Sequence, residues 1–344
     1  MTKRIPAEWE PHEFTQITWP SVNTDWADNL EAVTRCYVGI AKAVASYEPL
    51  LVITDSPDVV REALSDVRTK HPIRIVECPI NDTWARDHAF ITSVDEEGHP
   101  SLIDFQFNGW GLKFASCFDN QINAHLHGSV LKDNAYASAL KIVLEGGSIE
   151  SDGKGTILTT LHCLLAPNRN CYETKAEADA ALRPLLGHDL LLWVDHGCLA
   201  GDDTDGHVDT LARLAPDNTI LYVACEDQTD EHYAELKAME EDLKALRTQE
   251  GKPFRLVALP MATPTYDPET GERLPATYAN FYFVNGAVLL PVYNIPTDAA
   301  AIEVMQQTFA DLEVVAVPCA ELIRQHGSLH CATMQYPRGV KLSD

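Results

Sequence analysis

The fold class is indicated by one segment of the chain, DNLEAVTRCYVGIAKAVASYEPLLVIT (28–54). Its first part, 28–46, carries apolar residues at helical spacing. Its end, LLVIT (50–54), is a short apolar run with β-branched residues, which is typical of a buried strand. A helix followed after a few residues by such a strand is a building unit of α/β folds. The segment therefore predicts an α/β fold.

Similar helix-to-strand units occur five times, each helix being followed within about six residues by an apolar strand. The predicted helices are 28–46, 57–68, 174–186, 230–248 and 298–310. The predicted strands are LLVIT (50–54), IRIVECP (73–79), SLIDFQF (101–107), TILTT (156–160), LLLWV (190–194), TILYVA (219–224), FRLVALP (254–260), FYFVNGAVLLPVY (281–293) and EVVAVP (313–318). No strict period and no interdomain linker is found, and the Pro/Thr-rich segment 261–278 lies between strands. We therefore expect repeated β/α modules in a single domain, 1–344.

Composition limits the class of ligand. The chain has 344 residues, of which 26 are basic and 51 acidic, and its net charge of −25 opposes binding to nucleic acid or anionic membranes and favours cationic ligands. No apolar run reaches the ~20 residues of a membrane span, and the start, MTKRIPAEWEPHEF, lacks the apolar core of a secretion signal. Nine scattered cysteines indicate reduced thiols. We expect a cytoplasmic protein.

Two polar segments are candidates for a functional site. INDTWARDHAF (80–90) follows a predicted strand, where ligand contacts are common, although its Asp and Arg residues could instead pair and cap a turn. GDDTDGHVD (201–209) resembles a calcium loop only weakly, since the position that needs a bidentate Glu is occupied by Ala212. If this segment is extended, His207 and Asp209 face the same side, which suits proton transfer beside a cation.

Two further segments carry weaker signals. In LEGGSIESDGKGTILTTLHCLLAPNRN (144–170), Glu145 precedes two glycines that permit close backbone approach, although a hairpin with a polar edge is an equal interpretation. In HGSLHCATMQYP (326–337), Cys331 follows a glycine turn and a histidine, but a cysteine is more often a small buried apolar residue. No CxxC pair occurs, and His162-Cys163 is expected in a separate apolar strand context. We therefore expect no structural zinc site and no other metal.

Taken together, these segments resemble the agmatine deiminases, a branch of the guanidino-group modifying superfamily that also holds the bacterial peptidylarginine deiminase. The resemblance spans nearly the whole chain through PAEWEPHEFTQITWP (6–20), INDTWARD (80–87), FNGWG (107–111), LEGGS (144–148), DGKGT (152–156), PNRN (167–170), DTDGHVD (203–209), YANFYFVNG (278–286) and HCATMQ (330–335). It implies a five-bladed α/β propeller (pentein) with pseudo-fivefold repeats. It also implies catalysis without a cofactor, and relatives often form homodimers.

The resemblance also implies roles for individual residues. It implies Cys331 as nucleophile and His207 as general acid/base. Asp87 and Asp209 would grip the guanidinium, and Glu145 would orient or tune the histidine. At the far end of the substrate, the matching positions are Trp84, Asp203 and Asp82. The chain departs from the family pattern at His88-Ala89-Phe90, where Ser-Gly-Pro is common, and at Gly327-Ser328-Leu329-His330, where Gly-Gly-Asn-Ile-His is usual.

These residue types suit attack on a guanidinium carbon, which is a poor electrophile. Two carboxylates can each accept a pair of N–H bonds and hold the carbon over a thiolate. Asp203 and Trp84 suit the distal amine of agmatine through charge and cation–π contact. Alternatives remain open: peptidylarginine, free arginine with Arg169 or Arg86 at its carboxylate, or another guanidine. An inactive cation-binding relative and a zinc-dependent amidohydrolase with His207 as a ligand are rivals of other classes.

Overall fold

The structure is a computed structural model that describes residues 3–343. The strands in that range form five small sheets. The first sheet holds, in order, β16 (Thr333–Pro337), β1 (His12–Thr18), β2 (Leu50–Thr54) and β3 (Ile73–Glu77). The second sheet holds β4 (Ile91–Val94), β5 (Pro100–Gln106) and β6 (Ala135–Val143), and the third holds β7 (Ile149–Ser151), β8 (Thr156–Thr160) and β9 (Leu190–Val194). The fourth sheet holds β10 (Ala212–Ala215), β11 (Thr219–Ala224) and β12 (Arg255–Pro260). The fifth holds β13 (Tyr282–Val284), β14 (Ala287–Val292) and β15 (Glu313–Pro318). The predicted α/β class is confirmed.

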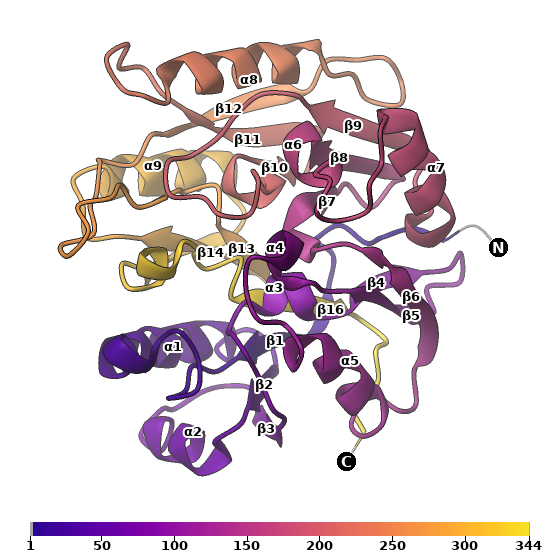
Figure 1. The fold of residues 1–344 in the computed structure, drawn as a ribbon, viewed down its shortest axis with the longest axis vertical. Coiled ribbons are helices and arrows are strands. Elements are labelled where there is room, and N and C mark those ends of the chain that lie inside the picture. The colour runs from indigo at the N-terminus through magenta and orange to yellow at the C-terminus, as the bar shows by residue number, and fades with distance from the viewer. Residues whose placement is uncertain (1–2, 344) are drawn as a thin grey trace.

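One pairing pattern is common to all five sheets. A central strand pairs antiparallel with one neighbour and parallel with the other. Parallel neighbours need a long crossover connection, and each crossover here contains a helix. These helices are α1 (Leu30–Val44), α5 (Asp119–His127), α7 (Lys175–Leu186), α8 (Tyr233–Ala245) and α9 (Asp298–Thr308). In Figure 1, α1, α7, α8 and α9 lie at the periphery of the molecule.

α1 and β2 show how the sequence produces one such unit. In α1 the buried residues Val33, Tyr37, Ile40 and Val44 recur every three or four positions, so they share one face of the helix. All five residues of β2 are buried, as expected for a strand between parallel neighbours with both faces covered. Each buried side chain of this size contributes roughly 1.5–3 kcal/mol relative to the exposed state. The segment 28–54 is therefore helix and strand as predicted.

The prediction of one strand at 281–293 is wrong. The structure has an antiparallel hairpin there, formed by β13 and β14, with Asn285 and Gly286 at its turn. Gly286 has φ +89°, which costs glycine little and strains other residues. Asn-Gly between two apolar runs is a strong hairpin signal, and the apolar character of both arms obscured it.

The five predicted helix–strand units also differ from the repeats that the structure shows. The helix predicted at 57–68 is α2 (Pro57–Ala63), which leads to β3, an additional fourth strand of the first sheet. The helix of the second sheet, α5, was not predicted because its sequence, DNQINAHLH, is polar with only two buried apolar residues, Ile122 and Leu126. Four of the five predicted units therefore belong to the common pattern.

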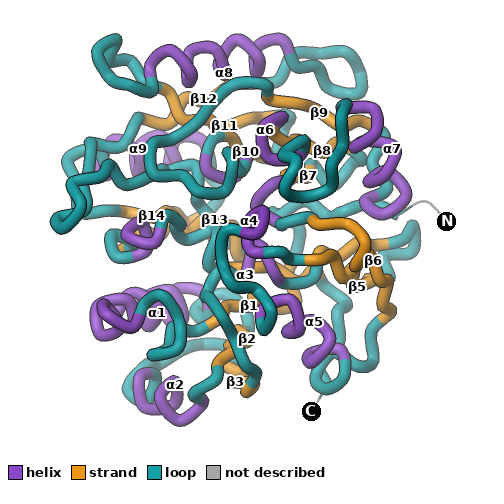
Figure 2. Tube along the Cα trace, in the orientation of Figure 1, coloured by secondary structure: helices purple, strands orange, loops and turns teal. Residues whose placement is uncertain are grey.

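Short helices complete the structure. They are α3 (Ala85–His88), α4 (Gly109–Leu112), α6 (Leu161–Leu164), η1 (Ala27–Asn29), η2 (Gly146–Ser148), η3 (Val208–Thr210) and η4 (Leu322–Gln325). Much of the chain between the sheets is loop, as Figure 2 shows. Among the helices of residues 3–343, none has the length and apolar character needed to cross a membrane.

Candidate active site

The predicted site residues lie in connections that lead from one sheet to the next. Asp87 is in α3, between β3 and β4, and Glu145 precedes η2, between β6 and β7. His207 and Asp209 lie around η3, between β9 and β10, while Cys331 lies between β15 and β16. α3 contacts η2 and β16, and η2 contacts η3. The fold therefore brings four distant parts of the chain together, beside α3 and α4 near the centre of Figure 1.

A pocket of about 440 Å³ lies at this junction. Its lining includes five of the predicted residues: Asp82, Trp84, Asp87, Asp203 and Cys331. The other three, Glu145, His207 and Asp209, are at most 1% exposed and are not part of the lining. The pocket is rich in carboxylates, and Asp25 is a further acid of its wall that the sequence did not indicate.

Asp87 is held rigidly. Its Oδ1 accepts a hydrogen bond from the backbone N–H of Gly147 at 3.0 Å, and its Oδ2 accepts one from Trp110 Nε1 at 2.9 Å. Burial raises the pKa of Asp87 to about 6, against the opposing attraction of His207. Two donors from different connections thus fix the carboxylate, and a bound cation would favour its ionised form.

Asp209 and Cys331 are in direct contact. The thiol of Cys331 donates to Asp209 Oδ2 at 3.8 Å, and the same oxygen accepts a hydrogen bond from His330 Nδ1 at 2.7 Å. Asp209 Oδ1 is buried without a hydrogen-bond partner among the described residues. Burial acts to raise the pKa of Asp209, but the hydrogen bond from His330 outweighs it and the pKa is lowered. The site thus presents an ionised carboxylate with one unused acceptor atom beside a thiol.

The surroundings of Cys331 favour the protonated thiol over the thiolate. Burial raises the pKa of Cys331 well above its ordinary value, and the charges of Asp209 and Asp87 raise it further. No cationic side chain lowers it to a comparable degree. A cation bound between the two carboxylates would remove part of this penalty.

The premise that residues 201–209 are extended, from which His207 and Asp209 were expected to face the same side, is wrong. His207 directly precedes the short helix η3, with ψ 135°, and Asp209 lies within that helix. Nδ1 of His207 is 3.7 Å from Asp87 Oδ1. Burial acts to lower the pKa of His207, but the charges of Asp87 and Cys163 outweigh it and raise the pKa well above its ordinary value. A histidine whose pKa is raised beside the Asp87 carboxylate suits the donation of a proton to a leaving group.

Cys163 does not sit in a separate context, as the sequence suggested. Its Sγ, a ring nitrogen of His207 and a carboxylate oxygen of Glu145 all lie within 4.8 Å of one another. These are metal-ligand types, but Arg169 Nε donates to both oxygens of Glu145, at 2.9 and 3.1 Å. Glu145 thus already has a cation as its partner, and its nearness to His207 agrees with a role in tuning that histidine.

The distal part of the pocket combines an aromatic wall with acids. A Cβ added at Gly327 would overlap the ring of Trp84, so glycine is needed for the loop to pass this close to the indole. Burial raises the pKa of Asp203, while His326 acts in the opposite direction. Asp82 Oδ1 accepts a hydrogen bond from the N–H of Thr83 at 2.7 Å.

Asp82→Asn is expected to stabilise the protein more at pH 8 than at pH 5. Burial, and then the charge of Asp119, raise the pKa of Asp82 to about 8, from about 3.9 for an unfolded chain. Between these values the folded state binds more protons, so its stability falls as pH rises towards 8. Asparagine still accepts the hydrogen bond from the Thr83 N–H, and it removes the carboxyl group that titrates. We expect the Tm difference from wild type to grow by about 2 °C or more between pH 5 and 8; a difference independent of pH would contradict the assignment.

Of the residues at the two departures from the family pattern, Gly327 lines the pocket and the others do not. His88 Nε2 is 3.3 Å from Thr18 Oγ1, and its backbone carbonyl accepts a hydrogen bond from Asn123 Nδ2. Ser328 Oγ is 2.8 Å from Tyr293 Oη. Both side chains are buried, so these substitutions alter the packing of the connections behind the pocket.

Several residues of the site were not predicted individually. Trp110 and Asn280 lie in FNGWG (107–111) and YANFYFVNG (278–286), which were noted only as motifs. Asn280 Oδ1 accepts from the backbone N–H groups of His330 and Cys331, at 2.9 and 3.2 Å, and thereby fixes the backbone that carries the thiol. Asp25 and Cys163 had no distinguishing sequence signal, because their contacts come from distant parts of the chain.

Comparison with known proteins shows the family to which the chain belongs. A sequence profile described as Porphyromonas-type peptidyl-arginine deiminase matches residues 4–337. An agmatine deiminase of Stutzerimonas stutzeri is 32% identical over 357 residues, covering 97% of this chain and 95% of its own. Among solved structures, one described provisionally as an arginine deiminase from Porphyromonas gingivalis is 47% identical with a TM-score of 0.91, covering 98% of this chain and 99% of its own. A C. jejuni agmatine deiminase with substrate bound is 35% identical with a TM-score of 0.91, covering 98% of this chain and 97% of its own. The chain belongs to the Porphyromonas-type peptidyl-arginine deiminase family.

Proposed function

We propose that this protein is an agmatine deiminase, a hydrolase that converts agmatine to N-carbamoylputrescine and ammonia. The observation that carries the proposal is the contact between Cys331 Sγ and Asp209 Oδ2, next to Asp209 Oδ1, a buried acceptor that has no hydrogen-bond partner within residues 3–343. Relatives named agmatine deiminases match nearly the whole chain. The carboxylate-rich pocket suits a substrate with two cationic ends.

Catalysis begins with binding of the guanidinium between Asp87 and Asp209. Burial makes the ionised form of Asp87 costly until a cation pairs with it, whereas Asp209 is already paired with His330. A bound guanidinium also stabilises the thiolate of Cys331, whose pKa the empty site keeps high. Ionisation of the nucleophile is thus coupled to occupation of the site, which protects the empty enzyme from unproductive alkylation and oxidation.

The thiolate then adds to the guanidinium carbon and forms a tetrahedral adduct. His207, whose pKa is raised beside Asp87, gives its proton to the departing nitrogen, and ammonia leaves. An S-alkylthiouronium on Cys331 remains. Neutral His207 takes a proton from water, the hydroxide adds to the same carbon, and the C–S bond breaks to release the thiolate. The protonated urea that is formed loses its hydroxyl proton to solvent and leaves as the neutral ureido product.

The distal ammonium of agmatine is assigned to Asp203, with the ring of Trp84 beside it. Asp203→Ala is therefore expected to raise KM for agmatine by roughly 10- to 100-fold, because a hydrogen bond to a charged group contributes about 1.5–3 kcal/mol. Propylguanidine, which lacks the amine, should show little change in KM. Steady-state assays of both substrates test this, and equal loss for both would instead assign Asp203 to support of the catalytic loop.

The decisive assay compares agmatine, free arginine and an arginine-containing peptide. Ammonia and the ureido product are measured for each, and we expect kcat/KM to be highest for agmatine. A higher kcat/KM for the peptide or for arginine would identify that compound as the substrate instead of agmatine. Binding of agmatine without turnover would identify an inactive cation-binding relative. Dialysis against a chelator should leave activity unchanged, whereas loss that zinc restores would favour a metal-dependent amidohydrolase using His207.

The proposal also includes expectations about the architecture, the cellular location and the partners of the protein. The five sheets, with their common pairing pattern, would be the blades of a five-bladed pentein propeller forming one domain, 1–344. The connections between blades would then meet at the active site, as the positions of Asp87, Asp209 and Cys331 suggest. The protein would act in the cytoplasm on a small cation, as a homodimer and without nucleic acid or membrane as a partner.

A further inference from the structure

His330, the residue before the nucleophile, lies between two carboxylates. Its Nδ1 is 2.7 Å from Asp209 Oδ2, its Nε2 is 2.6 Å from Glu8 Oε2, and the residue is 1% exposed. A neutral imidazole offers one N–H and one acceptor nitrogen, whereas a carboxylate only accepts. Two contacts this short to two ionised carboxylates therefore require an N–H on each ring nitrogen.

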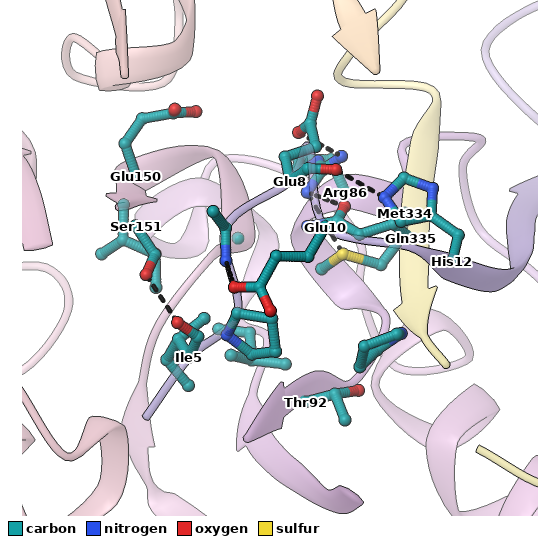
Figure 3. Close-up of a pocket in the computed structure, with 16 residues that line it drawn as sticks. Ile5, Glu8, Glu10, His12, Arg86, Thr92, Glu150, Ser151, Met334 and Gln335 are labelled. Atoms are coloured by element: carbon teal, nitrogen blue, oxygen red, sulfur yellow. Dashed lines mark hydrogen bonds and ion pairs between the residues drawn. The ribbon is translucent and has the colours of Figure 1, made fainter. Parts of the chain in front are cut away.

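Glu8 is ionised in this arrangement. Its Oε2 also accepts from Arg213 Nη2 at 3.0 Å, and its Oε1 accepts from the backbone N–H of Phe283 at 2.9 Å. Burial acts to raise the pKa of Glu8, but Arg213 and His330 outweigh it and hold the pKa well below its ordinary value. In Figure 3, Glu8 and Arg86 lie together on the wall of a second pocket, and their side chains are joined by an ion pair of 3.5 Å. Glu8 is thus anchored by cations and is not a proton donor to His330.

Asp209 gains a fixed orientation from the same contact. His330 occupies Oδ2 and leaves Oδ1 as its unpaired, buried acceptor. The backbone carbonyl of Asp209 accepts from Asn280 Nδ2 at 3.2 Å, and Asn280 also holds the backbone of His330 and Cys331. The acceptor atom and the thiol are therefore positioned by one connected set of hydrogen bonds.

We propose that the His330 ring carries a proton on each nitrogen, so that it positions Asp209 for the guanidinium and balances its charge beside Cys331. The proposal rests on the function proposed above and adds a positioning residue to it. His330 does not face the pocket and does not exchange protons with the substrate. Two charged groups contact the His330 ring directly, Asp209 and Glu8. Arg213 and Arg86 pair with Glu8, and Glu150 pairs with Arg213. The ring of Tyr282 lies beside the imidazole, with its centroid 6.2 Å from that of His330.

His232 provides a matched internal contrast. The backbone N–H of Ala200 donates to its Nε2 at 2.7 Å, so that nitrogen is an acceptor, and its Nδ1 is 2.7 Å from Asp230 Oδ1. This buried histidine is neutral by the same geometric argument. It lies away from the pocket lined by Cys331.

The charge state is tested in the whole protein labelled with ¹⁵N-histidine. At pH 7, NMR should show protons on both ring nitrogens of His330 and on only one of His232, with signals assigned through His330→Gln and His232→Gln. A single ring N–H on His330 would overturn the proposal. This measurement needs no turnover, so its result stands even if agmatine is not the substrate.

The positioning role is tested by kinetics. His330→Gln should lower kcat/KM for agmatine by roughly 10²-fold, the loss that displacement of a reacting group by about 1 Å produces. Glu8→Gln should have a smaller effect and should remove one ring N–H signal of His330, while His232→Gln should leave kcat/KM within twofold of wild type. Activity of a folded His330→Gln variant within twofold of wild type would overturn the proposal. Absence of activity in wild type would count against the proposed substrate instead.

Discussion

Cys331→Ala is expected to abolish deimination of agmatine, with kcat falling by roughly four orders of magnitude or more, as removal of a covalent nucleophile does in other enzymes. The thiol lines the pocket and contacts Asp209, a carboxylate proposed to bind the guanidinium. Removing its sulfur leaves Asp87, Asp209 and His207 in place, so agmatine should still bind. Release of ammonia and of the ureido product measures the first effect, and calorimetric titration with agmatine measures the second.

Cysteines elsewhere supply the control. Cys117 and Cys171 are exposed and lie outside the pocket lining, so alanine at either position should leave kcat unchanged. Mass spectrometry of wild type quenched during turnover should find the thiouronium adduct on the peptide that carries Cys331 and on no other. Residual activity of Cys331→Ala above one per cent of wild type would remove Cys331 from the nucleophile's role.

The parts of the fold that the sequence predicts are those with strong local patterns. LLVIT (50–54), TILTT (156–160) and LLLWV (190–194) are strands at the predicted bounds. The first two are buried along their whole length, and the third is a partly buried strand at the edge of its sheet. β6 and α5 were not predicted, because β6 is Ala-rich and largely exposed and α5 is polar, so both take their structure from packing against the rest of the sheet. Strand β16 was noted only as part of a catalytic motif, and its pairing with β1 depends on residues more than 300 positions apart.

In the candidate site, too, residue identities could be predicted from the sequence and spatial relations could not. The identities of Cys331, His207 and Asp87 could be predicted because their motifs resemble those of a known family. Their mutual geometry could not, since each lies in a different connection and only the fold places the connections together. The pairing of Asp209 with His330 joins two such connections and leaves no local trace in the sequence.

Gly147→Ala is the second substitution for which we expect a large effect, a fall in kcat/KM of roughly 10²-fold or more. A Cβ at this position would lie 2.6 Å from His207 Nδ1, 2.9 Å from Asp87 Oδ1 and 3.1 Å from Asp209 Oδ2. Gly147 does not have a positive φ, so alanine is acceptable to the backbone and the conflict is with the three functional groups alone. Overpacking of this kind costs about 1–3 kcal/mol of stability, which the protein can tolerate while the site is displaced.

Gly39→Ala is the matched control for that substitution. Gly39 lies within α1, and a Cβ there would meet no atom within 4 Å, so alanine should stabilise the helix by up to about 1 kcal/mol. We expect Gly39→Ala to raise Tm and keep full activity, and Gly147→Ala to lose activity while remaining folded by circular dichroism. Because Asp87 accepts from the N–H of Gly147, the glycine sets the distance between the backbone and three functional groups at once. Full activity of Gly147→Ala would show that His207 moves freely in the site, and the proton transfer assigned to it would then need a different geometry.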